Sequence, residues 1–197
     1  TAVSGANGIY KSIDTGATWT KVSSAAMDAL LIDYTTSNVE IAVGNSGEVN
    51  VAILNSGQLR NGGVFRSPNG NAGTWTAMDV PLVNETGGTV GTNPRYKPDA
   101  GIPGGQGSIH FSILADPDNS NLLYVGGDRQ PAGYNDQHGF PNALMAYDYS
   151  GRLFRGDASQ NATGTVPSPQ WKHLTHTIDA AGMTGGGTTS NSSPHAD

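Results

Sequence analysis

The sequence contains no cysteine, and this absence excludes disulfide bridges, thiolate metal sites and cysteine nucleophiles. It is also poor in charge, with 13% charged residues where a typical soluble domain has about 25%. No apolar run reaches the roughly 18 residues that a membrane-spanning helix needs. The net charge of −6 comes without a basic stripe, so we expect no nucleic-acid partner.

What the sequence has in abundance is glycine, with 28 in 197 residues, together with serine, threonine and asparagine. These residues favour tight turns, because Gly and Asn tolerate positive φ and Ser or Asp side chains bond to nearby backbone. Short apolar runs recur between the turn signals, which argues against disorder. The length is enough for one sizeable domain, and the pattern predicts an all-β fold.

A hairpin pattern occurs three times along the chain. It joins two short segments through a turn, and a tryptophan opens the second segment each time. The tryptophans are Trp19, Trp75 and Trp171, and the paired segments are 8–12 with 18–22, 63–67 with 74–78, and 151–156 with 170–174. Tandem copies of one pattern predict a repeat architecture.

A second pattern lies between these hairpins. Apolar runs at 29–32 and 111–115 each lead through an Asp-x-x-x-Ser-Asn turn, at 33–38 and 116–121, into strands at 39–44 and 122–127. Combined with the hairpin, this gives four strands per repeat, and tandem four-stranded antiparallel sheets are the blades of a β-propeller. A jelly roll or sandwich would explain the strand density but not the repeated Trp turn.

We therefore expect a single partial β-propeller domain over 1–197, with about three blades. Its expected parts are blade 1 at about 1–25, blade 2 at about 26–83, blade 3 at about 108–178 and the start of a fourth blade at about 190–197. A closed propeller has more blades, about 4–8. The first partners that we expect are thus the remaining blades of a longer protein.

The first hairpin carries the pattern Ser-x-Asp-x-Gly-x-Thr-Trp, formed by Ser12, Asp14, Gly16, Thr18 and Trp19. We expect Asp14 to accept hydrogen bonds from turn amides and Gly16 to supply a positive φ. We expect Trp19 to bury a large apolar area over the hairpin. The pattern resembles the BNR repeat, or Asp-box, of sialidase-like β-propellers. A degenerate copy keeps Ser67, Asn69, Gly73 and Trp75, and a third copy keeps Trp171.

The resemblance implies that the Asp-box is structural and lies on the outer rim, with cation binding by Asp14 as the alternative. Such boxes occur in sialidases, xyloglucan-active glycosidases, sortilin-like receptors and large bacterial secreted proteins, and residues 40–197 resemble the last group. We therefore expect an extracellular or cell-surface module that binds glycan or matrix, or is structural. The alternative is a glycoside hydrolase of sialidase-like or xyloglucanase-like type, although no Arg-Ile-Pro motif is present.

Propeller ligands bind at the mouth of the central channel, so the candidate functional residues are those on segments expected there. The catalytic candidates are Asp128, Asp197 and His195, since glycoside hydrolysis normally needs two carboxylates. The ligand-binding candidates are His110, Arg129, Arg95, Tyr96 and His138. The competing interpretation is that these side chains only bond to channel waters and loop backbone.

Asp116 and Asp118 superficially resemble a calcium loop, but the Gly and the distal Glu of an EF-hand are missing. We interpret 116–121 as the turn between two strands, with calcium binding as the alternative. No other cofactor is expected.

Overall fold

The computed structural model describes residues 7–31, 36–55, 62–85, 88–90, 111–129 and 151–175. These residues form strands with one short helix between them, so the predicted all-β fold is confirmed. The elements are β1 (Tyr10–Lys11), β2 (Thr20–Lys21), α1 (Ala25–Asp28), β3 (Thr36–Val43), β4 (Val49–Asn55), β5 (Gly63–Ser67), β6 (Thr76–Met78), β7 (Val83–Glu85), β8 (Gly88–Val90), β9 (Ser112–Ala115), β10 (Leu122–Arg129), β11 (Gly151–Asp157) and β12 (Trp171–His173).

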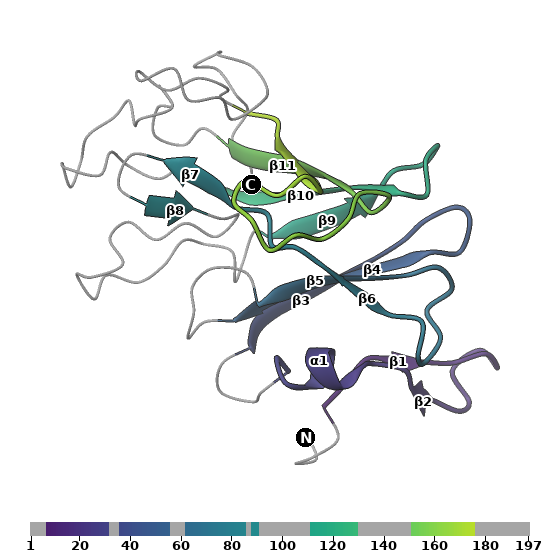
Figure 1. Ribbon diagram of the computed structural model, residues 1–197. Coiled ribbons are helices and arrows are strands. Elements are labelled where there is room, and N and C mark those ends of the chain that lie inside the picture. Colours follow the sequence, from purple (N-terminus) through teal and green to yellow (C-terminus); the bar gives the residue numbers. More distant parts are fainter. Residues whose placement is uncertain are drawn as a thin grey trace.

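Two four-stranded antiparallel sheets dominate the structure, β3-β4-β5-β6 and β9-β10-β11-β12, each with its strands in chain order. The hairpin β1-β2 precedes them, and the hairpin β7-β8 is a separate pair. We call β1-β2 the first repeat, β3–β6 the second and β9–β12 the third. Figure 1 shows the three repeats layered one on another, with the second in the middle. The described helix α1 has a single turn, and no helix in the described part is long and apolar enough to cross a membrane.

The third repeat has the predicted strands. The run 111–115 contains β9, the turn 116–121 follows, and β10, β11 and β12 lie where the sequence pattern places them. Asp116 starts the turn because its Oδ1 accepts hydrogen bonds from the amides of Asp118 and Asn119, both at 3.0 Å. This is the local side-chain bonding that favours Asp at the first position of a turn.

The prediction for the start of the second repeat is wrong by one strand. The apolar run 29–32, expected to be the first strand, instead follows helix α1, whose N-cap Ser24 accepts a 3.3 Å hydrogen bond from the Met27 amide. The residues expected to form the second strand belong to β3, which is the first strand of the sheet. The true second strand is β4, which the prediction missed.

Strand β4 is central and buried on both faces. Val51 and Ile53 point to one side, Ala52 and Leu54 to the other, and all are buried. A strand covered on both faces has a continuous apolar run and no alternation with polar residues, so its period does not identify it as a strand.

Two hydrophobic cores lie on the two faces of the second repeat. The core toward the first repeat is built on Met27, Val51, Ile53 and Phe65. The core toward the third repeat consists of Ala52, Leu54, Val64, Met78, Phe111, Leu123, Val125, Phe154 and Trp171. Burying each Val, Leu, Ile, Phe or Met side chain contributes about 1.5–3 kcal/mol relative to an exposed one, so these interfaces hold the layers together.

Candidate functional site

The turn 12–18 is organised around the carboxylate of Asp14. Its Oδ1 accepts hydrogen bonds from the Thr18 amide and the Ser12 hydroxyl, both at 2.8 Å, and its Oδ2 accepts one from the Thr18 hydroxyl at 2.6 Å. The Ser12 hydroxyl in turn accepts the Gly16 amide at 2.8 Å. Gly16 has a φ of 91°, which a side chain would disfavour. The predicted role of Asp14 as an acceptor for the turn is confirmed.

The second turn has a related network although asparagine replaces the carboxylate. Oδ1 of Asn69 accepts the Thr74 hydroxyl and the Asn71 amide, both at 3.0 Å. The Ser67 hydroxyl accepts the Gly70 amide at 2.7 Å, as Ser12 does for Gly16. The turn therefore needs a side-chain oxygen at this position and does not need a negative charge.

We predict that Asp14 titrates far below a free aspartate. Its hydrogen bonds from the Thr18 hydroxyl, then the Thr18 amide and the Ser12 hydroxyl, lower its pKa from 3.8 to about 2. A depressed folded-state pKa stabilises the fold above pH 3.8, and this contribution is lost as the pH falls through about 2. NMR titration of the side-chain carboxyl carbon measures the value, and a pKa near 3.8 would contradict the network. Asp14→Asn should remove this part of the acid dependence and leave the neutral-pH fold intact, as Asn69 indicates.

The three equivalent tryptophans differ in what they contact. The Trp75 indole N–H donates to the Val22 carbonyl at 2.6 Å, and the Trp171 indole N–H donates to the Asp79 carbonyl. Val22 directly follows β2, and Asp79 directly follows β6. Each bond therefore joins one repeat to the end of the repeat before it.

Trp19 departs from the prediction that it buries a large area. Its side chain is 62% exposed. Its indole N–H donates to Gly16 within its own turn, at 3.1 Å. The physical reason is that a Trp at this position packs on the preceding repeat, and the described residues contain none before β1.

Asp79 is an interface residue that the sequence did not reveal. Its amide donates to Oε1 of Gln170 at 2.8 Å, and its carboxylate accepts the Thr163 and Gly164 amides at 2.8 and 3.0 Å and the Ser168 hydroxyl at 2.6 Å. Burial opposes the charge, but the bonds from Ser168, Thr163 and Gly164 outweigh it and lower the pKa of Asp79. Asp79 thus fixes the long loop of the third repeat to the end of the second.

Basic side chains make a further set of links between repeats. Lys11 donates to the Asn69 carbonyl at 2.8 Å and to Oδ1 of Asn71 at 2.9 Å. Arg66, at the same place in the second hairpin, donates to the Ser120 carbonyl at 2.7 Å. Both cations bind neutral carbonyl groups of the following repeat, so their role is to position one turn against the next.

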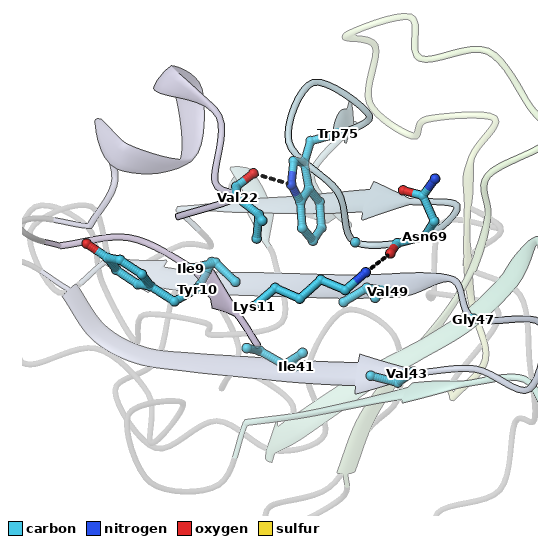
Figure 2. Close-up of a pocket in the computed structure, with 11 residues that line it drawn as sticks. Ile9, Tyr10, Lys11, Val22, Ile41, Val43, Gly47, Val49, Asn69 and Trp75 are labelled. Atoms are coloured by element: carbon cyan, nitrogen blue, oxygen red, sulfur yellow. Dashed lines mark hydrogen bonds between the residues drawn. The ribbon is translucent and has the colours of Figure 1, made fainter. Parts of the chain in front are cut away.

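A groove opens between the first and second repeats (Figure 2). Its cavity volume is about 300 Å³, and most of its lining residues are aliphatic or aromatic, with Lys11 and Asn69 among the polar ones. The lining residues are Ile9, Tyr10, Lys11, Val22, Ile41, Val43, Gly47, Val49, Asn69, Gly70 and Trp75. Figure 2 shows the Lys11 side chain reaching across the groove to the Asn69 carbonyl. The sequence patterns did not identify this groove.

Most of the predicted channel-mouth residues lie outside the described residues. This applies to Arg95, Tyr96, His110, His138, His195 and Asp197. Asp128 and Arg129 belong to the end of β10, where they pair with Arg152 and Gly151 after a register shift beyond Val125. Only their backbone is described, so the predicted pair Asp128 and Asp197 stays a prediction.

Asp116, one of the two calcium candidates, organises the turn 116–121. The Asp116 carboxylate accepts the Asp118 and Asn119 amides on Oδ1 and the Tyr124 hydroxyl, at 2.9 Å, on Oδ2. The amide of Asp118 and the hydroxyl of Tyr124 lower the pKa of Asp116, and the same bond raises the pKa of Tyr124. Within the described residues, no group of three or more His, Asp or Glu side chains is placed to hold a metal ion.

Comparison with known proteins identifies no relative of this chain. No family model, curated protein or solved structure matches the chain.

Proposed function

We propose that the chain is part of an Asp-box β-propeller in a secreted or cell-surface protein, where it binds glycan or matrix or serves as a structural module. The observation that carries the proposal is the pair of equivalent bonds from Trp75 to Val22 and from Trp171 to Asp79. They repeat one contact at two successive layers, as expected where similar repeats pack on their neighbours. The exposed Trp19 has the same place in the first repeat, which supports further blades as its partner.

The sheet topology supports a propeller over a jelly roll. Both four-stranded sheets follow the chain in consecutive order, as blades do, whereas a jelly roll needs Greek-key connections between two sheets.

Four described carboxylates lack the property that a general acid needs. A general acid in glycoside hydrolysis needs a raised pKa. Asp14, Asp79, Asp116 and Asp157 all have a lowered pKa because hydroxyl and amide donors surround them. These four carboxylates are structural acceptors, and the glycosidase alternative keeps Asp128 and Asp197 as its predicted pair.

The test is a glycan and polysaccharide array probed with the chain, with hydrolysis measured in parallel on the same ligands. We expect binding without turnover, or neither if the module is only structural. Hydrolysis that is lost in Asp128→Asn or Asp197→Asn would replace this proposal by the glycosidase. Asp118→Asn, on an exposed turn, is the matched control.

A further inference from the structure

Two aliphatic side chains of β3 are left uncovered, although the strand beside them is buried or half-buried on the same face. Ile41 is 50% exposed and Val43 is 68% exposed. They lie directly opposite Val51 and Val49 of β4 and therefore share their face of the sheet. Val51 is fully buried, so the first repeat covers the centre of this face and leaves its β3 edge open.

The other face of the second repeat shows what covers such an edge. There β9, the first strand of the third repeat, packs on β3 and β4. Its Ile113 packs against the core between the two sheets. First strands of successive repeats thus lie against each other. By the same relation, Ile41 and Val43 should contact the first strand of the first repeat. The described residues of that repeat form only β1, β2 and α1, so no described strand covers these two side chains.

We propose that the groove between the β1-β2 hairpin and β3 is a docking site for one extended peptide strand with aliphatic residues at alternate positions. Alternate side chains of a strand point to one face, so two of them would cover Ile41 and Val43. The main chain of the strand would run along the groove that Figure 2 shows.

The positive charge in the groove favours one kind of residue in the docked strand. Lys11 is the one charged residue in the lining, and its ammonium binds two neutral oxygens. An acidic residue at that end of the strand is therefore favoured over a basic one. The inference depends on the correspondence between repeats and is independent of the proposed glycan binding.

A peptide of this chain serves as the probe. The segment 111–116, Phe-Ser-Ile-Leu-Ala-Asp, contains β9 and ends in an acidic residue. With capped ends and a fluorophore, it should bind the chain saturably in fluorescence polarisation. Ile41→Lys and Val43→Lys should each weaken the binding about tenfold or more, because a charge replaces the apolar contact.

The matched control is Leu114→Lys in the protein, a residue 60% exposed on β9. It should leave the affinity unchanged. A peptide with serine in place of Ile113 and Ala115, the aliphatic residues at alternate positions, should not bind the chain. All three variants change exposed residues, so unchanged circular dichroism and melting temperature would show that the fold is retained. Equal affinity for the parent chain and for Ile41→Lys would overturn the site. Dimerisation of the chain that Ile41→Lys abolishes would overturn the choice of occupant in favour of a second copy.

Discussion

Trp171→Ala is expected to destabilise the chain by about 3–5 kcal/mol, the usual cost of removing a buried aromatic side chain. Trp171 is 6% exposed, belongs to the core between the second and third repeats and donates its indole N–H to Asp79. Gly156 lies so close that an added Cβ would come within 2.7 Å of the indole ring. The sheet is therefore shaped around this side chain, and alanine would leave a cavity.

Trp19→Ala is the matched control from the same position of the first repeat. Because its indole is mostly exposed, we expect a loss below about 1 kcal/mol, typical of surface substitutions. Trp75→Ala should fall between the two, since Trp75 is half-buried and bonded to Val22. Urea denaturation of the three variants gives the order. Equal losses at Trp19 and Trp171 would contradict the described difference in burial.

Asp79→Ala is expected to have the second-largest effect, about 2–3 kcal/mol, because hydrogen bonds to a charged group contribute about 1.5–3 kcal/mol and several are lost together. The buried Ser168 hydroxyl would lose its acceptor, and the loop around Thr163 and Gly164 would lose its attachment. Thermal melting should show the loss at neutral pH.

The acid dependence of Asp79 gives an independent check. Its pKa is lowered in the fold, so its stabilisation is complete above 3.8 and declines as the pH falls below that value. The difference in stability between the parent chain and Asp79→Ala should therefore shrink in acid. Asp118→Ala, which removes an exposed turn carboxylate, should match the parent at neutral pH. A constant difference from pH 7 to pH 2 would contradict the role given to the Asp79 charge.

Local residue chemistry explains which parts of the fold could be predicted. The turn 12–18 and the turn 116–121 depend on bonds between residues at most four positions apart, and such bonds leave a readable pattern. Helix α1 was missed because its four residues are too few to show a helical period. Strand β4 was missed because burial on both faces removes the alternation that marks a strand.

The links between repeats could not be predicted in the same way. Asp79 bonds to Thr163, 84 positions along the chain, and nothing in its neighbours distinguishes it from a solvated turn residue. The groove at Ile41 and Val43 was also hidden, since an exposed and a buried aliphatic side chain are alike in the sequence. The hairpin repeat itself could be predicted from the sequence because each copy has a tryptophan at the same position.

The central claim is that the second and third repeats are each joined to the repeat before by a tryptophan indole N–H. Hydrogen exchange of the three indole protons, resolved by ¹⁵N NMR and assigned with Trp→Phe variants, tests this claim most directly. We predict slow exchange for Trp171 and Trp75, whose bonds lie between repeats, and fast exchange for Trp19 on its exposed turn. Exchange of Trp75 and Trp171 as fast as that of Trp19 would contradict the account.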